Sequence, residues 1–236
     1  MTEVALVTGA AGALGAEIAR TLARRGYGLA LVGAEPARAR LDELARSLGR
    51  ASVVAGDVAS EVTWTEAMPR IERDLGGAPS VAALVAGAWR GGKPFHEETD
   101  DEVWRAMMTA NLDTVRRGLR ALLPPMVARK RGSIVVIGSR VVEQPWTGGG
   151  AAAYAASKSA VVALARTVAA EVLEHGVRVN ALMPSTMDTP ANRKAMPKAD
   201  PDRWVSLQSA AGVVAFLLGD EARDISGAAL PLYGRA

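Results

Sequence analysis

The segment VALVTGAAGALG, residues 4–15, joins a short apolar run to a turn that contains three glycines. Helical periodicity begins directly after it, at Ile18, Leu22 and Arg25. A strand, a tight turn and a helix N-terminus in this order direct unpaired backbone N–H groups and the positive end of the helix dipole toward an anion. The segment therefore predicts a turn that binds a pyrophosphate.

Each glycine of this turn has a separate predicted task. Gly9 permits the tight turn, Gly12 lets a phosphate approach the backbone, and Gly15 allows close packing of the helix. The predicted dinucleotide contacts in the turn are Gly9, Ala11, Gly12, Leu14 and Gly15. A glycine-rich turn that binds no ligand is the alternative, because 24 glycines in 236 residues exceed the usual share of about 7%.

The rest of the chain alternates short apolar runs with longer segments of helical period. We expect strands at residues 4–8, 29–32, 52–55, 81–86, 133–137, 178–182 and 228–232, and helices at 13–25, 36–48, 61–75, 100–129, 153–174 and 205–218. This order predicts a parallel sheet with helices on both faces. No linker divides the chain, so we predict one α/β domain over residues 1–236, a doubly wound fold of the Rossmann type that binds NAD(P). The proline-rich stretch 184–204 predicts a flap on the substrate side.

The composition excludes several classes of function. The 28 basic and 25 acidic residues leave a net charge of only +3, which is too small to predict a nucleic-acid-binding protein. The absence of cysteine excludes disulfides and thiolate chemistry, and two histidines make a metal site hard to build. We expect no metal, no membrane segment and a cytoplasmic protein, since no apolar run is long enough for a signal or a membrane span.

The end of the second predicted strand bears on the choice of coenzyme. Acidic residues there bond the adenosine ribose hydroxyls, whereas basic residues accommodate a 2′-phosphate. Gly33 and Ala34, expected beside the ribose, offer neither group. Glu35 can bond a ribose or face solvent, and Arg38 or Arg40 can reach a phosphate or lie on a solvated face. Because no acidic residue ends the strand itself, we favour NADP over NAD.

A tyrosine and a lysine stand four residues apart at the start of the helix expected over 153–174. Tyr154 and Lys158 therefore share one helical face, where an ammonium near a phenol lowers the pKa of the phenol. The ordinary alternative is a packed tyrosine beside an exposed lysine. Ser139 follows the strand expected over 133–137, at the edge where open α/β sheets bind ligands.

These residues together resemble the short-chain dehydrogenase/reductase family, over essentially the whole chain. The resemblance implies Tyr154 as the acid/base, Lys158 as the residue that lowers its pKa and bonds the nicotinamide ribose, and Ser139 as the group that polarises the substrate carbonyl. It also implies Asn111 as the helix asparagine that holds a proton-relay water. For Asn111, an internal polar group without a catalytic role is the alternative.

The resemblance implies further coenzyme contacts, which are Asp57, Val58, Ala86, Gly87, Pro184, Met187 and Thr189. Asp57 would lie beside the adenine, and Thr189 would contact the carboxamide or a phosphate. Ser185 departs from the family pattern, because it stands where glycine is usual. Trp89, Trp146 and Met187 are the expected substrate contacts, although large apolar residues are as often part of a core or an interface.

Segments 86–92 and 183–197 look like those of dihydropteridine reductases, so a related activity is one alternative. A complete Asn-Ser-Tyr-Lys set instead indicates reduction of a ketone, or the reverse oxidation of a secondary alcohol, as our main hypothesis. A coenzyme-binding sensor or scaffold without catalysis is the other alternative. The family resemblance implies a homotetramer. Apolar stripes at 112, 115, 119 and 122 and at 161, 164, 168 and 172 suit helix pairing between subunits, or equally packing against the sheet.

Overall fold

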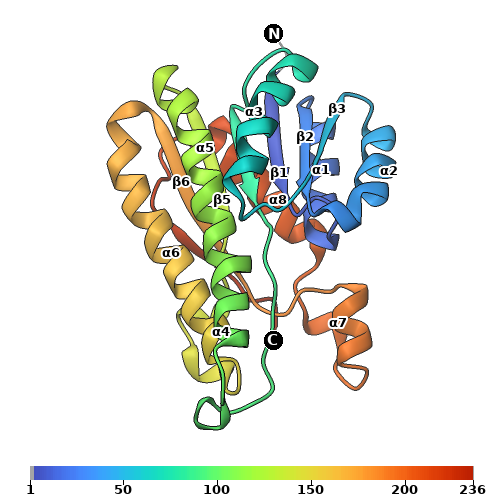
Figure 1. Ribbon diagram of the computed structural model, residues 1–236, viewed down its shortest axis with the longest axis vertical. Coiled ribbons are helices and arrows are strands. Elements are labelled where there is room, and N and C mark those ends of the chain that lie inside the picture. Colours follow the sequence, from blue (N-terminus) through green and yellow to red (C-terminus); the bar gives the residue numbers. More distant parts are fainter. Residues whose placement is uncertain (1–2, 236) are drawn as a thin grey trace.

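The computed structural model describes residues 3–235 and contains a seven-stranded sheet of order β3-β2-β1-β4-β5-β6-β7 (Figure 1). All neighbouring strands run parallel. The strands are β1 (Val4–Thr8), β2 (Gly28–Gly33), β3 (Ala51–Ala55), β4 (Val81–Leu84), β5 (Gly132–Ile137), β6 (Val177–Pro184) and β7 (Ala229–Leu232). The predicted α/β fold with a single parallel sheet is confirmed.

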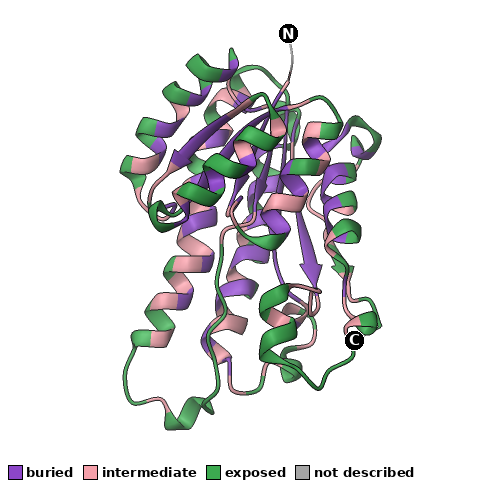
Figure 2. Cartoon of the chain, turned by 90° about the vertical axis from the view of Figure 1, so that its right-hand side faces the viewer, coloured by how far each residue is buried: buried purple, intermediate pink, exposed green. Residues whose placement is uncertain are grey.

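Helices cover both faces of the sheet, as parallel strands require. The helices α1 (Ala13–Arg24), α2 (Arg38–Leu48) and α8 (Leu207–Leu218) supply the apolar core on one face, and α3 (Glu61–Leu75), α5 (Thr114–Ala128) and α6 (Ala152–Val172) supply it on the other. Figure 2 shows the central strands buried between these two layers, whereas the edge strand β7 is partly exposed. None of the helices in residues 3–235 is long and apolar enough to cross a membrane.

The sheet reverses its strand order between β1 and β4. Ligands of open α/β sheets bind beside the carboxyl ends of the strands at such a reversal. The short helices α4 (Glu102–Met107) and α7 (Pro190–Ala195) project beyond this end of the sheet, at the bottom of Figure 1. The topology thus brings the glycine turn, the end of β5 and the start of α6 to one edge.

Some boundaries differ from the predicted ones, and each difference has a local cause. Strand β4 ends at Leu84 rather than at 86, because the next two backbone N–H groups donate to Thr8 Oγ1 instead of to a strand. Helix α8 begins at Leu207, since the Ser206 side chain caps it by accepting from Ser209 N. The helix expected over 100–129 is divided by a π-helical turn, Met108–Asp113.

The predicted flap, 184–204, has more structure than its prolines indicated. It contains α7, whose first turn is capped by Thr189 Oγ1. Its base is closed by two backbone hydrogen bonds, from Val205 N to Thr186 O and from Asp188 N to Val205 O, both 2.8–2.9 Å long. Its role toward a substrate stays a prediction.

The two apolar stripes that we considered for helix pairing between subunits mostly face the sheet. The buried core contains Val115, Leu119, Leu122, Val161, Val168 and Val172, whereas Leu112 and Leu164 pack against that core while partly exposed. These stripes therefore do not by themselves indicate a helix-pairing interface.

Candidate active site

The glycine turn between β1 and α1 tolerates no side chain at two of its positions. Gly9 has φ +64°, and a Cβ there would lie 3.0 Å from the backbone of Ala86. A Cβ on Gly15 would lie 2.3 Å from Gly9 O. The turn therefore needs glycine at both positions, the first for its backbone conformation and the second for close packing.

The N-terminus of α1 is open to a ligand. Gly12 occupies the N-cap position and so provides no side-chain cap, and the first turn contains no acidic residue. The Leu14 side chain is buried in the core, so this residue has only its backbone to offer. Uncapped N–H groups at the positive end of a helix dipole fit the pyrophosphate of a dinucleotide.

The segment after β4 is fixed by side chains from two other elements. Thr8 Oγ1 accepts from Val85 N at 2.9 Å and from Ala86 N at 3.1 Å. Asn111 Oδ1 accepts from Ala88 N at 2.9 Å. Gly87 lies between these two hydrogen-bonded residues, Ala86 and Ala88, and is exposed. A Cβ on Gly87 would lie 2.7 Å from Asn111 Oδ1 and 3.4 Å from Lys158 Nζ.

The buried Asn111 joins three parts of the site. It lies in the π-helical turn, and its Nδ2 donates to Ser157 Oγ at 3.0 Å. Ser157 Oγ in turn donates to Tyr154 O at 2.8 Å. The amide group of Asn111 therefore links the segment after β4 to the first turns of α6. The water-holding role that the resemblance implies for it stays a prediction.

Ser139 and Tyr154 meet at the carboxyl end of β5. Ser139 is buried directly before the 3-10 turn Arg140–Val142, where its Oγ accepts from Val141 N at 3.5 Å, and its hydroxyl lies beside the half-buried Tyr154. Burial raises the pKa of the Tyr154 phenol, and the neighbouring Ser139 hydroxyl acts in the opposite direction. A phenol that keeps its proton at neutral pH is poised to donate it.

Lys158 is buried and reaches back to the sheet. Its Nζ donates to Ile137 O at 2.8 Å, and burial lowers its pKa to about 8. We expected this ammonium to lower the pKa of Tyr154. Burial, which disfavours the phenolate, is the largest influence on Tyr154 and raises its pKa, so the expected lowering by Lys158 stays a prediction.

The adenosine end of the site lies beside β2. Gly33 is packed under Leu41, whose Cδ1 would lie 3.3 Å from a Cβ on this glycine. Glu35 and Arg38 form a two-point ion pair, with Nε to Oε1 at 2.6 Å and Nη2 to Oε2 at 3.0 Å. Ala34, the residue before this pair, is exposed.

Beyond β3, Asp57 is exposed and accepts from Ala59 N at 2.9 Å, while Val58 is buried and its carbonyl accepts from Trp64 Nε1. Asp57 thus shapes its own turn and keeps a second carboxylate oxygen toward solvent. Both residues stay predicted coenzyme contacts.

On the opposite side, Pro184 ends β6 and Met187 is half-buried at the base of the flap. The Thr189 hydroxyl accepts from Asn192 N, which leaves its proton available to a ligand. Trp89 and Trp146, both predicted substrate contacts, expose 65% and 77% of their surface. The structure leaves both indoles accessible, and their contact with a substrate stays a prediction.

Sequence reasoning missed the supporting functions of two residues. Thr8 directly precedes Gly9, and Ser157 stands between Tyr154 and Lys158, so both were visible in the motifs. Their hydrogen bonds connect segments 77 and 46 residues apart in sequence, which only the folded chain reveals. Among residues 3–235, no group of three or more His, Asp or Glu side chains is placed to hold a metal ion.

Comparison with known proteins agrees with this geometry. Residues 3–200 match the family described as short chain dehydrogenase. Galactitol 2-dehydrogenase (L-tagatose-forming) of Cereibacter sphaeroides is 36% identical over 245 residues, which cover 98% of this chain and 93% of that enzyme. 2,3-Dihydro-2,3-dihydroxybenzoate dehydrogenase of Bacillus subtilis is 35% identical over 79% of this chain and 70% of that enzyme.

Solved structures share the whole fold. NAD+-bound xylitol dehydrogenase superposes with a TM-score of 0.88 and 28% identity over 98% of each chain. The 3-ketoacyl-(acyl-carrier-protein) reductase from Brucella melitensis complexed with NADH gives 0.86 and 26% over 99% of this chain and 98% of that one. The chain belongs to the short-chain dehydrogenase family and is an oxidoreductase that uses a nicotinamide coenzyme.

Proposed function

We propose that the site interconverts a secondary alcohol and a ketone, with Tyr154 exchanging the proton and Ser139 bonding the substrate oxygen. The position of the Ser139 hydroxyl beside Tyr154 carries this proposal, because one oxygen atom of a substrate can lie within reach of both hydroxyls. Both lie at the edge of the sheet that also holds Gly87 and Lys158.

The residues fit a dinucleotide at this edge. The uncapped N-terminus of α1 would hold the pyrophosphate, and Gly87 leaves room beside Asn111 and Lys158 for the nicotinamide ribose. When bound, the coenzyme supplies or accepts the hydride. Lys158 Nζ, which now donates to Ile137 O, would use its remaining protons to bond the ribose.

Each protein group has one task in the proton transfer. In the reduction, the Tyr154 hydroxyl gives its proton to the carbonyl oxygen as that oxygen gains negative charge. The Ser139 hydroxyl donates a second hydrogen bond to the same oxygen and so stabilises the charge. In the oxidation, the Tyr154 phenolate removes the proton of the substrate hydroxyl, which is the same step in reverse.

The substrate class extends the proposal. The enzymes of similar sequence and structure include dehydrogenases named for galactitol, xylitol and D-beta-hydroxybutyrate. A small substrate with a secondary hydroxyl suits the paired Ser139 and Tyr154 hydroxyls, whereas the accessible Trp89 and Trp146 offer apolar surface around it.

The test is a panel assay of the purified protein, following the reduced coenzyme with galactitol, xylitol and D-3-hydroxybutyrate in the oxidation and with simple ketones and a quinonoid dihydropteridine in the reduction. Turnover of at least one secondary alcohol and of its matching ketone supports the proposal. Activity confined to dihydropteridines, or coenzyme binding without turnover of any compound, contradicts it.

We favour NADP over NAD as the coenzyme. The support is Arg38, five residues after the end of β2, whose guanidinium pairs with Glu35 and would exchange it for the 2′-phosphate of NADP. Relatives solved with NAD bound make the direct comparison necessary. Arg38→Ala should weaken NADPH binding about tenfold and leave NADH unchanged, with Arg46→Ala, at an exposed position of the same helix, as the matched control. An equal effect on both coenzymes contradicts this preference.

A homotetramer is the assembly that the family resemblance favours, and light scattering at micromolar concentration tests it. Four times the monomer mass of 24.6 kDa supports the proposal, and the monomer mass contradicts it. The cytoplasmic location expected from the sequence stays a prediction.

A further inference from the structure

The residues after β7 contact the site from a side that the proposed reaction does not use. Residues 233–235, which we call the return segment, follow Leu232 at the same end of the sheet as Ser139. They form hydrogen bonds with three separate elements, which are the turn after β5, the end of β6 and the base of the flap.

The first contact reaches the turn that begins at Ser139. The Tyr233 hydroxyl donates to Glu143 Oε2 at 2.8 Å. Burial and this hydrogen bond raise the pKa of Tyr233 to about 12, so the hydroxyl keeps its proton in the alkaline buffers used for alcohol oxidation. Glu143 is exposed, so the hydrogen bond from Tyr233 restricts a side chain that solvent would otherwise leave mobile.

The turn itself is short and internally bonded. Val142 N donates to Ser139 O, while Glu143 N and Gln144 N both donate to Arg140 O. These three hydrogen bonds stabilise the conformation of the turn, so a displacement of Glu143 is transmitted through the turn to Ser139. An anchor on Glu143 therefore restrains the backbone at Ser139 through these bonds.

The second contact fixes Tyr233 against the coenzyme side of the site. Ser185 Oγ donates to Tyr233 O at 2.7 Å, and Ser185 N donates to Leu232 O at 3.0 Å. Ser185 stands where the family usually has glycine, and a glycine has no hydroxyl for this bond. The hydrogen bond to Tyr233 O therefore gives the Ser185 hydroxyl a structural role at a position where the family usually has glycine.

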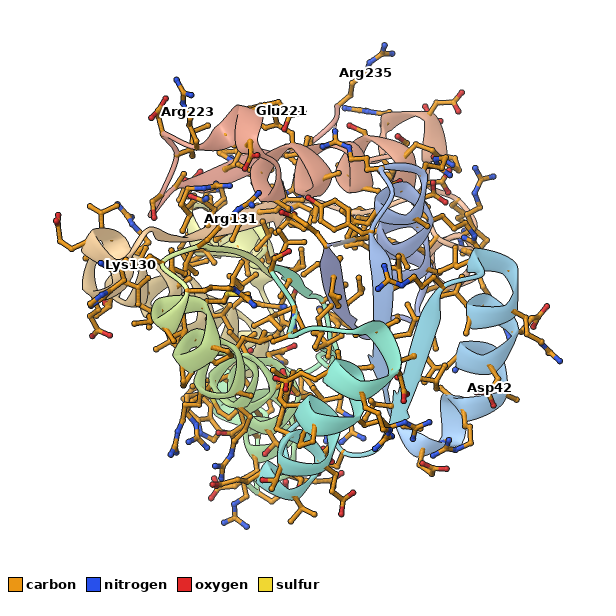
Figure 3. All side chains as sticks on the ribbon, turned by 90° about the horizontal axis from the view of Figure 1, so that it is seen from above. Asp42, Lys130, Arg131, Glu221, Arg223 and Arg235 are labelled. Carbon is orange, nitrogen blue, oxygen red and sulfur yellow. The ribbon has the colours of Figure 1, made fainter. Side chains whose placement is uncertain are left out.

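The third contact joins Arg235 to Arg203 at the base of the flap. Arg235 N donates to Arg203 O at 2.9 Å, and the Arg203 guanidinium donates twice to Arg235 O, at 2.9 and 3.1 Å. Only the backbone of Arg235 takes part, because its side chain points away from the molecule (Figure 3). Gly234, at φ +64°, permits the close approach, since a Cβ there would lie 2.8 Å from Arg203 O.

We propose that Tyr233 is a positioning residue, which holds the turn 139–144 through Glu143 and thereby sets the Ser139 hydroxyl against Tyr154. The inference rests on the proposed function of Ser139. The return segment also binds the base of the flap and the end of β6. It therefore holds the turn 139–144 at a fixed distance from the flap.

Two measurements on the full chain test this proposal. The first is amide hydrogen exchange of residues 142–144 in Tyr233→Phe, Glu143→Ala and Glu143→Gln, with the coenzyme absent. The second is kcat, KM and coenzyme Kd with the best alcohol of the panel. Tyr27→Phe is the matched control, because Tyr27 is also half-buried and lies at the opposite end of the sheet.

We expect exchange of residues 142–144 to rise about fivefold in Tyr233→Phe and Glu143→Ala, the effect of one partly exposed hydrogen bond. kcat should fall by a similar factor, with the coenzyme Kd unchanged. Glu143→Gln keeps an acceptor oxygen and should restore both values, and Tyr27→Phe should change neither. Combining Tyr233→Phe with Glu143→Ala should add nothing to either single variant.

Unchanged exchange in Tyr233→Phe would overturn the proposal, and so would faster exchange with an unchanged kcat. A fall in kcat that Tyr27→Phe shares, or that Glu143→Gln does not restore, would assign a general loss of stability instead. If the wild-type enzyme turns over no panel compound, the proposed function fails. The exchange comparison still decides whether Tyr233 holds the turn.

Discussion

Replacement of Gly15 by alanine tests the fit of the glycine turn most severely. The added Cβ would lie 2.3 Å from Gly9 O, 2.8 Å from Gly9 C and 2.9 Å from Ala10 Cα. All three are backbone atoms, so no side chain can rotate away. Relief requires that the turn separates from α1, which disrupts the hydrogen bond from Gly12 N to Gly9 O.

The expected cost follows from three contributions to the free energy of unfolding. A forced backbone shift costs about 1–3 kcal/mol, and a disrupted hydrogen bond costs about 1 kcal/mol more. Alanine in place of glycine inside a helix returns about 0.5–1 kcal/mol. Gly15→Ala should therefore destabilise the protein by about 1–3.5 kcal/mol, and lower Tm by about 2–14 °C for a domain of this size.

Gly212→Ala is the matched control, because Gly212 lies in α8, is exposed, and has no heavy atom within 4 Å of its added Cβ. This variant should gain about 0.5–1 kcal/mol. The assay is thermal unfolding with and without NADH or NADPH. At about 100 times Kd, a coenzyme stabilises the wild type by about 2.7 kcal/mol.

The Gly15→Ala variant should lose the coenzyme shift as well as stability, whereas Gly212→Ala keeps it. Wild-type stability and a full coenzyme shift in Gly15→Ala would refute the reasoning from the close approach of Gly9 and Gly15.

Three other predictions concern the chemistry. Gly87→Ala places a Cβ 2.7 Å from Asn111 Oδ1, so turnover should fall about tenfold or more while the free energy of unfolding changes by about 1 kcal/mol; equal kcat in both proteins would contradict this. Burial disfavours the charged form of Lys158 in the folded protein and lowers its pKa from 10.5 to about 8. The free energy of unfolding is therefore lowest below pH 8 and increases as the pH rises from 8 to 10.5. Lys158→Met removes this charge, so its advantage in free energy of unfolding over the wild type should be largest below pH 8. Urea titrations should show that advantage decreasing by about 3 kcal/mol between pH 8 and 10.5; a difference that does not change with pH would contradict the lowered pKa of Lys158. Ser139→Ala removes the hydroxyl that lowers the pKa of Tyr154, so the alkaline rise in alcohol oxidation should move to higher pH, with kcat reduced about 100-fold; an unmoved pH profile would contradict it.

The sequence allowed most of the fold to be predicted, because its signals are local. Strand β1, the glycine turn and α1 appear in one segment of about twenty residues, and every predicted strand is present within a few residues. The π-helical turn at Asn111 was not predicted, since its i→i+5 bonds leave no mark on a helical pattern of apolar residues. Helix α7 was also missed, because two prolines flank a polar stretch that is capped only by Thr189.

The candidate site was predicted as a set of residues and not as a set of contacts. The motifs contain Tyr154, Lys158, Ser139 and Asn111, but the partners of their side chains are distant in sequence. The pKa of Tyr154 illustrates the limit, because its direction depends on how much water reaches the phenol, which no spacing of residues encodes. The contact between Tyr233 and Glu143 spans 90 residues and has no motif at all.

The most direct test of the account compares Tyr154→Phe with the wild type, using a secondary alcohol that the wild-type enzyme oxidises. The variant removes one oxygen atom and keeps the ring that packs at the start of α6. The account predicts that kcat falls by a factor of about 100 or more, while the thermal shift with the coenzyme stays at its wild-type value. Wild-type turnover in Tyr154→Phe would contradict the account, because the proton would then come from another group.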